Sequence, residues 1–289
     1  FLLTAVTLCQ YISCHKELRT DSYQSVLEAF KNPPNEFKSV PFWVWNDAIT
    51  REQIETQLMD FQQKGMGGVF IHPRPGLITP YLSEEWLSLC RSAVEEGRSR
   101  GMKVWLYDEN SYPSGFAGGH VPAEMPDAVL SGLQMKKMNK LPDPFEIHPE
   151  VVLIKNNNEF EDITSDIQKY LGKTGDFYVF EILRQSPSSW YGGFTYVDLL
   201  RREVTEKFLD ITLNAYKRTL GEEFGQTVPG VFQDEAHISP PGGRDVINYT
   251  PALFESFQKK WGYDLRIHLP SLYEEEGEWK KIRHNFYAL

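Results

Sequence analysis

Short apolar runs and amphipathic segments alternate along the first third of the chain. The runs at residues 41–46, 67–72 and 103–109 are typical of strands that are buried on both faces. Between them, residues 50–64 and 83–100 repeat apolar side chains every three to four positions, which predicts two helices. An order of strand, helix, strand, helix and strand indicates right-handed parallel βαβ units.

The alternation stops after residue 127. Residues 128–189 contain strand-like runs and polar turns but no clear amphipathic helix, so we predict an antiparallel β insertion, with a separate small β domain as the alternative. Regular alternation then returns, with expected strands at 196–200 and 228–233 and expected helices at 202–220 and 251–261.

These elements favour an α/β fold of the (β/α)8 TIM-barrel type. Segments 41–127 and 190–289 have the length of about four or five βα units, whereas a closed barrel has eight. We therefore expect an incomplete barrel, its first half, and the alternative is an open doubly wound sheet. The expected organisation is a signal at 1–13, an extended lead-in at 14–40, a first barrel segment at 41–127, the β insertion at 128–189, and a second, truncated barrel segment at 190–289.

The first thirteen residues carry no side chain that is charged at neutral pH, and they are followed by Cys14. This stretch is too short to span a bilayer but suits the apolar region of a secretory signal. Residues 12–14 resemble a lipobox, so we expect export to the periplasm or cell surface, with a lipid on Cys14 as the membrane attachment. A buried first helix or strand is the alternative. In the helix expected at 83–100, Cys90 should be a small buried hydrophobe.

Charge and composition exclude several classes of protein. The formal net charge of −10 argues against a nucleic-acid partner, because such proteins need a basic face to displace counterions from phosphates. Three cysteines in 289 residues exclude a disulfide scaffold. Seven Trp and 14 Tyr are enough to form a stacking surface for sugar rings, although a large core would also use them.

Two of the expected strands end in the same pair of acidic residues, Asp108-Glu109 and Asp234-Glu235. Parallel α/β folds place their active sites at these carboxyl ends. Two facing carboxylates are what cleavage of a glycosidic bond requires, because one protonates the leaving oxygen and the other activates water or attacks the anomeric carbon. Strand side chains alternate, so one residue of each pair should face the opening. Capping of the following segment is the structural alternative.

Other strand ends supply candidate supporting residues. We expect eight residues to support the carboxylates or to bind substrate: Asp234, Asp108, His72, Arg74, Trp45, Asn46, Tyr107 and Asn110. A single histidine such as His72 is more often structural, and Arg74, between two prolines, could equally form a salt bridge. Trp43 and Trp45 should not both face the barrel interior, so one of them should belong to the core.

Sequence spacing gives little support for cofactors. No His-x-x-x-His, Cys-x-x-Cys or EF-hand pattern is present, and the glycine-rich segment 113–119 lacks dinucleotide or P-loop spacing. No organic cofactor is therefore expected. The oxygen-rich run at Asp108, Glu109 and Asn110 suits calcium, which prefers carboxylate and amide ligands.

Several segments resemble the opening of bacterial family 106 glycoside hydrolases, the α-L-rhamnosidases. The resemblance is carried by residues 41–46, 67–74, 81–86, 105–110 with 113–115, and 228–235. It implies a barrel catalytic domain, exported glycan degradation, inversion at the anomeric carbon and a calcium ion near the sugar. It also makes Glu235 and Glu109 the matching strand-end glutamates, with acid and base unassigned. Family members are far longer, so the later strands and β-sandwich domains are absent here.

The leading hypothesis is an exported glycosidase that cleaves α-L-rhamnosides or related plant or microbial glycans. Its principal carboxylates would be Glu235 and Glu109. One alternative is a non-catalytic surface lipoprotein that binds glycans, and another is a barrel fragment inactive on its own. A barrel enzyme of different chemistry, such as an aldolase, is disfavoured because strand-end lysines and phosphate-binding glycines are lacking.

Overall fold

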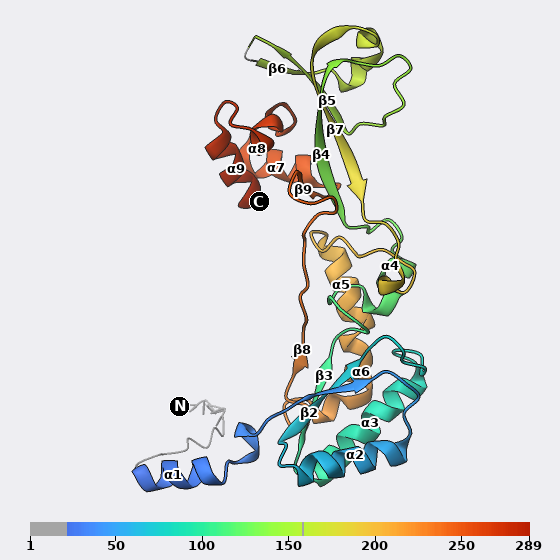
Figure 1. The fold of residues 1–289 in the computed structure, drawn as a ribbon, viewed down its shortest axis with the longest axis vertical. Coiled ribbons are helices and arrows are strands. Elements are labelled where there is room, and N and C mark those ends of the chain that lie inside the picture. Colours follow the sequence, from blue (N-terminus) through green and yellow to red (C-terminus); the bar gives the residue numbers. More distant parts are fainter. Residues whose placement is uncertain (1–21, 158) are drawn as a thin grey trace, which may run out of the picture.

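The computed structural model describes residues 22–157 and 159–289, so the expected signal at 1–13 and the lipidation site at Cys14 lie outside the described residues. The chain forms two sheets that lie toward opposite ends of an elongated molecule (Figure 1). The parallel sheet consists of β1 (Phe42–Trp45), β2 (Gly68–Pro73), β3 (Lys103–Tyr107) and β8 (Val231–Phe232). The antiparallel sheet consists of β4 (Ser131–Lys140), β5 (Val151–Asn156), β6 (Glu159–Asp162), β7 (Thr174–Arg184) and β9 (Val246–Tyr249).

In the parallel sheet the strands lie side by side in chain order, β1-β2-β3-β8. Three helices, α2 (Arg51–Gln63), α3 (Glu84–Ser99) and α6 (Leu213–Leu220), contribute to one core with it. Strand residues of that core include Val69, Ile71, Val104 and Leu106, which share one face of the sheet. Chain-order strands with helices on one face match the winding of a barrel rather than a doubly wound sheet. A closed barrel is not formed by the described residues.

The two β1 tryptophans correct one expectation. Trp43 and Trp45 are two positions apart, so their side chains share a face, and both are buried in the core between sheet and helices. The Trp45 ring packs against Trp86 of α3 with 5.2 Å between ring centroids. Trp45 therefore supports the sheet from behind and is not positioned to hold a sugar.

The other face of the parallel sheet is lined by aromatic side chains. Phe42 lies 5.0 Å from Phe232, and Phe70 lies 5.2 Å from Trp105, measured between ring centroids. Phe42 is 46% exposed, so no described element covers this face there. In a barrel this is the interior face, and it leads towards the carboxyl ends of the strands.

The predicted helix at 50–64 is confirmed as α2, and its start follows from a capping box. The Gln53 N–H donates to Thr50 Oγ1 at 3.3 Å, and the Thr50 N–H donates to Gln53 Oε1 at 2.8 Å. The helix expected at 83–100 is confirmed as α3, whose N-cap Ser83 accepts from the Trp86 N–H at 3.1 Å. Cys90 of α3 is buried in the core, as expected.

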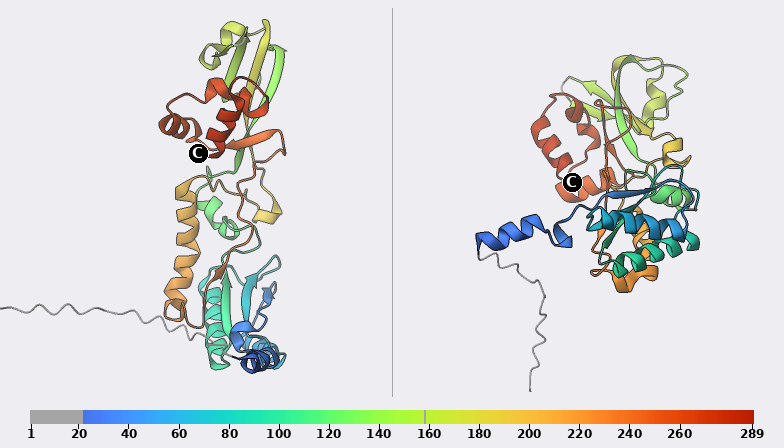
Figure 2. Two further views of the ribbon diagram at one scale, coloured as in Figure 1. Left: turned by 90° about the vertical axis from the view of Figure 1, so that its left-hand side faces the viewer. Right: turned by 60° about the horizontal axis from the view of Figure 1, so that its bottom comes forward.

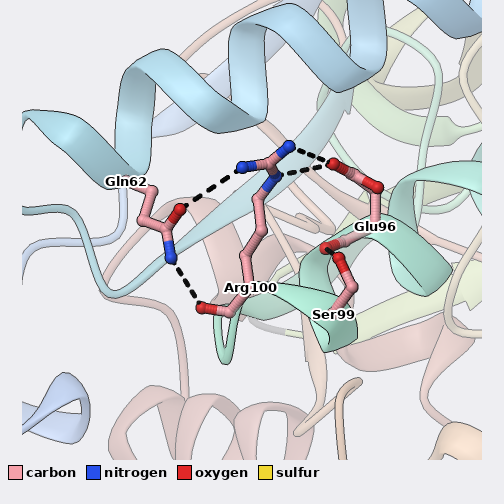
Figure 3. Close-up of polar contacts among 4 residues, drawn as sticks. All are labelled: Gln62, Glu96, Ser99 and Arg100. Carbon is pink, nitrogen blue, oxygen red and sulfur yellow. Dashed lines mark hydrogen bonds and ion pairs between the residues drawn. The ribbon is translucent and has the colours of Figure 1, made fainter.

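Polar contacts join the carboxyl-terminal ends of α2 and α3 (Figure 3). Gln62 Nε2 donates to the Arg100 carbonyl at 2.9 Å, and Arg100 Nε donates to Glu96 Oε1 at 2.6 Å. The Ser99 hydroxyl donates to the Glu96 carbonyl at 2.8 Å. In βα units these helix ends lie away from the carboxyl ends of the strands, so this cluster is structural.

The predicted antiparallel insertion is present, but its sheet extends beyond residues 128–189. Strand β9, from the segment expected to continue the barrel, pairs antiparallel with β4. The expected helix at 251–261 forms as α7 (Leu253–Trp261) and contributes to the core of this antiparallel sheet. Helices α8 (Pro270–Tyr273) and α9 (Trp279–Tyr287) join the same core. The second half of the chain thus divides between the two sheets.

The helix expected at 202–220 is divided at Thr212 into α5 (Arg202–Ile211) and α6, which follow one another along one side of the molecule (Figure 2). The Thr212 hydroxyl donates to the Phe208 carbonyl at 2.7 Å, a bond that competes with regular helical hydrogen bonding. The strand expected at 196–200 is reduced to a bridge between Val197 and Val129. The remaining helices are α1 (Tyr23–Lys31) and α4 (His120–Glu124). Among the described residues no helix has both the length and the apolar character needed to cross a bilayer.

Candidate active site

The candidate site lies where β3 and β8 end. These strands are parallel neighbours in the sheet (Figure 1), and Tyr107 is the register partner of Phe232. The Asp108 N–H donates to the Phe232 carbonyl at 3.2 Å, so the ladder continues to the first residue after β3. Asp108 and Asp234 are consequently brought to the same edge of the sheet.

One residue, Ser114, links both aspartates. Its hydroxyl donates to Asp108 Oδ1 at 2.5 Å and accepts from the Asp234 N–H at 2.9 Å, and its own N–H donates to the Asp234 carbonyl at 2.7 Å. Tyr196 adds a further bond, donating its hydroxyl to the Ser114 carbonyl at 2.7 Å. Ser114 is fully buried, so water does not compete for these bonds.

The aromatic face of the sheet ends in Tyr107 and His72. The Tyr107 hydroxyl donates to Asp234 Oδ2 at 2.6 Å, and the His72 ring stacks on Tyr107 with 4.0 Å between centroids. His72 is 3% exposed, and neither ring nitrogen has a protein partner among the described residues. Burial lowers the pKa of His72 to about 4, with Arg74 acting in the same direction and Asp234 opposing. A neutral imidazole here offers one donor and one acceptor to a ligand.

Asp108 is buried beside a second carboxyl group. Burial raises the pKa of Asp108 to about 6; the Ser114 hydrogen bond opposes this shift and the charge of Asp234 adds to it. Near neutral pH Asp108 therefore retains a proton more often than an ordinary aspartate does. Two carboxyls with different environments are suited to divide acid and base roles.

Glu109 has a different placement from the one expected. Its side chain is fully buried, and its carboxylate accepts backbone N–H bonds from Asn110, Gly115, Phe116, Ala117 and Gly118. Burial raises the pKa of Glu109 to about 8, and these N–H donors act in the opposite direction. With no exposed surface and both oxygens used by the loop, Glu109 positions residues 110–118 and is not available to a substrate. This corrects its assignment as a principal carboxylate.

Glu235 is exposed and follows Asp234 with a backbone φ of +46°. This left-handed conformation is uncommon for a residue other than glycine and costs roughly 1–3 kcal/mol. Glu109 and Glu235 therefore do not form a matched pair, since one is enclosed in a loop and the other faces solvent.

The remaining predicted residues lie around this centre. Arg74 is half-buried, with its guanidinium carbon 5.4 Å from the Tyr112 ring centroid, and its buried Nη1 lacks a partner among the described residues. Asn46 is exposed, and Asn110 begins the loop that Glu109 holds. Sequence reasoning did not assign Ser114, although it noted the glycine-rich segment that contains it. Buried Ser111, with an unpartnered hydroxyl, was also missed.

The expected calcium site is not supported by these contacts. The Glu109 oxygens face N–H donors, which a cation would have to displace, and Asp108 Oδ1 accepts from Ser114. Among residues 22–157 and 159–289 no group of three or more His, Cys, Asp or Glu side chains is arranged to hold a metal ion. Asp108 and Glu109 thus do not fit calcium.

Comparison with known proteins gives a distant structural likeness. No protein-family model matches the sequence, and no curated protein matches it. The structure of a rhamnosidase from Novosphingobium sp. PP1Y is similar to this chain, with a TM-score of 0.53 and 12% sequence identity. The similarity covers 84% of this chain and 42% of the rhamnosidase chain, so this chain spans less than half of that protein. At this identity the likeness concerns the fold alone: the architecture of this chain is similar to that of a portion of the rhamnosidase.

Proposed function

We propose that this chain carries a glycoside hydrolase site of the family 106 type, acting on α-L-rhamnosides or related glycans, with Asp108 and Asp234 as its carboxylates. The observation that carries the proposal is that Ser114 links the Asp108 carboxylate to the backbone of Asp234 at the point where two adjacent parallel strands end. The fold likeness to a rhamnosidase supports the substrate class. The chain corresponds to 42% of the rhamnosidase chain, and the activity of a whole enzyme is therefore part of what we propose.

The two aspartates have environments that suit different roles. Asp108, whose pKa burial raises to about 6, is the general acid that protonates the leaving glycosidic oxygen. Asp234 is half-buried and accepts the Tyr107 hydroxyl at Oδ2, which holds its carboxylate in place for the role of base. Neutral His72 and the unpartnered Nη1 of Arg74 would hold sugar hydroxyls beside them.

The reaction proposed is a single displacement with inversion. Asp234 takes a proton from water, the water oxygen bonds to the anomeric carbon, and the bond from that carbon to the leaving oxygen breaks. The leaving oxygen receives its proton from Asp108, and bulk solvent returns both aspartates to their starting states. The anomer formed first, observed by proton NMR, distinguishes inversion from retention.

Hydrolysis of an aryl α-L-rhamnoside by the full chain tests the proposal. Asp108→Asn and Asp234→Asn should each remove most turnover, while circular dichroism shows an unchanged fold. Full turnover in both variants would exclude this pair. Binding of the rhamnoside without turnover in the unmodified chain would instead favour a glycan-binding protein.

Glu235 is the second candidate for the base. Its exposed carboxylate and left-handed backbone follow Asp234 directly, and strained residues cluster at functional sites. Measuring Glu235→Gln in the same assay shows whether Glu235 or Asp234 is the base. Loss of turnover in Glu235→Gln with retention in Asp234→Asn would move the base to Glu235.

A further inference from the structure

A tryptophan next to the candidate site is exposed yet held in a fixed orientation. Trp190 lies in a single-turn 3-10 helix, Ser189–Tyr191, and is 43% exposed. Its indole Nε1 donates to the Tyr112 carbonyl at 2.6 Å, and its ring meets the Tyr112 ring at 5.2 Å between centroids, almost perpendicular. The hydrogen bond restricts the side chain without burying it, so much of the indole surface stays accessible.

The loop that carries Trp190 is anchored on both sides. Tyr191 packs against Phe116 and Tyr196, at 5.3 and 5.6 Å between ring centroids, in a buried cluster. The Ser188 N–H donates to the Phe194 carbonyl at 2.9 Å and closes the loop. Adjacent side chains thus have opposite roles: Tyr191 fastens the loop to the core, and Trp190 is presented to solvent.

Tyr112 connects this loop to the candidate site. It belongs to the segment 110–118 whose backbone Glu109 holds, and the guanidinium of Arg74 lies 5.4 Å from its ring centroid. None of the ion pairs between described residues involves Arg74, and its buried Nη1 lacks a partner among them. A series of contacts therefore runs from Arg74, just after β2, through Tyr112 to Trp190.

We propose that Trp190, together with Tyr112 and Arg74, forms a binding subsite for a second sugar ring of an oligosaccharide substrate. This inference rests on the proposed glycosidase function and extends it to the unit beyond the cleaved bond. A pyranose has an apolar C–H face that packs on an aromatic ring, while its hydroxyls can accept from an unpartnered guanidinium N–H. The substrate class is thus a glycan of at least two rings and not a simple alkyl rhamnoside.

Kinetics on two substrates test the subsite. Methyl α-L-rhamnoside has no second ring, whereas a rhamnosyl disaccharide has one. Trp190→Ala should raise KM for the disaccharide about tenfold, the loss expected for an aromatic stacking contact, and leave kcat unchanged. It should leave both constants for methyl α-L-rhamnoside unchanged. Equal effects on the two substrates, or no effect on either, would overturn the subsite.

Two further variants separate stacking from structural damage. Trp279→Ala removes a half-buried tryptophan of α9, whose ring contacts Lys280 and Arg283, and should leave both substrates unaffected. Trp190→Phe keeps an aromatic ring but loses the hydrogen bond to Tyr112, so it should raise KM for the disaccharide less than Trp190→Ala does. Equal losses in Trp190→Phe and Trp190→Ala would contradict a stacking role.

Calorimetric binding of the disaccharide distinguishes failure of this inference from failure of the proposed function. If the unmodified chain hydrolyses neither substrate but binds the disaccharide, the proposed hydrolysis fails. The subsite then stands if Trp190→Ala weakens that binding about tenfold. Unchanged binding in Trp190→Ala, or no binding by the unmodified chain, would overturn it.

Discussion

Carboxylates around the antiparallel sheet and those at the carboxyl end of the parallel sheet have different partners. Around the antiparallel sheet, Glu181 and Glu276 pair with lysines, Lys136 and Lys155, at 2.9 and 2.8 Å, and these groups are partly accessible to water. At the end of the parallel sheet, Asp108 is buried and is bonded to a serine hydroxyl in place of a cation. Burying a carboxyl without a cation is unfavourable for folding, and such arrangements concentrate where chemistry needs a shifted pKa. This difference supports the proposal that the active site lies at the carboxyl end of the parallel sheet.

The largest expected effect is on catalysis, and it is measured by removing one carboxylate near each sheet. Asp234→Asn should lower kcat/KM for an aryl α-L-rhamnoside by about 10³-fold, within the range for loss of a general acid or base. The control Glu181→Gln removes a carboxylate of β7 and should leave kcat/KM unchanged. Equal activity in the two variants would erase the distinction between the sheets.

Glu109→Gln should cause the largest loss of stability. The amide Nε2 would face backbone N–H donors that now bond to a carboxylate oxygen, which leaves buried groups unsatisfied. Above pH 8, where the Glu109 carboxyl is ionised, we expect the free energy of unfolding in urea to fall by about 3 kcal/mol. The control Glu276→Gln breaks a partly exposed ion pair and should cost about 0–1 kcal/mol. A smaller loss in Glu109→Gln than in the control would contradict the positioning role of Glu109.

The raised pKa of Asp108 predicts how stability depends on pH. The folded state keeps the Asp108 proton up to about pH 6, while the unfolded chain releases it near its ordinary value of 3.8. The protonated Asp108 side chain therefore makes its full contribution to the free energy of unfolding below about pH 4, and this contribution is lost as the pH rises through about 6. Relative to Asp108→Asn, the unmodified chain should lose about 2 kcal/mol between pH 4 and 7 in urea unfolding. Parallel pH curves for both proteins would argue against a buried, titrating Asp108.

Ser114→Ala gives the smallest expected effect and sharpens the comparison between two buried serines. Loss of its hydrogen bonds should lower the free energy of unfolding by about 1 kcal/mol. Ser131→Ala in β4 should have a similar effect, because the Ser131 hydroxyl donates to the Val129 carbonyl. Only Ser114→Ala should alter the pH profile of kcat. The Ser114 bond lowers the pKa of Asp108, so its removal moves the alkaline fall in activity to higher pH. Identical pH profiles for the two variants would contradict the role of Ser114.

Sequence patterns predicted the strands and helices of the parallel sheet well, because these elements depend on residues that are close together in the sequence. Apolar runs gave β1, β2 and β3, and the capping residues Thr50 and Ser83 gave the starts of two helices. The pairing of β9 with β4 could not be predicted in this way, since it joins segments more than 100 residues apart. The division of the helix at Thr212 was also missed, because helical periodicity continues across it.

The candidate site was predicted in location but not in its division of roles. The Asp-Glu endings of two strands were expected at one edge of the sheet, and Asp108 and Asp234 lie together there. Sequence could not show that the loop 110–118 folds around Glu109, because that depends on backbone N–H groups and not on side-chain type. The same limit applies to Ser114, whose importance lies in bonds to two distant strand ends.

The coupling between Asp108 and Asp234 is tested most directly by carbon-13 NMR titration of the Asp108 carboxyl in the unmodified chain and in Asp234→Asn. Asp108 should titrate near pH 6 in the unmodified chain, because it is buried and lies near a second carboxylate. In Asp234→Asn its pKa should be lower, since one of the causes that raise it has been removed. An Asp108 pKa that is the same in Asp234→Asn as in the unmodified chain would contradict the coupling.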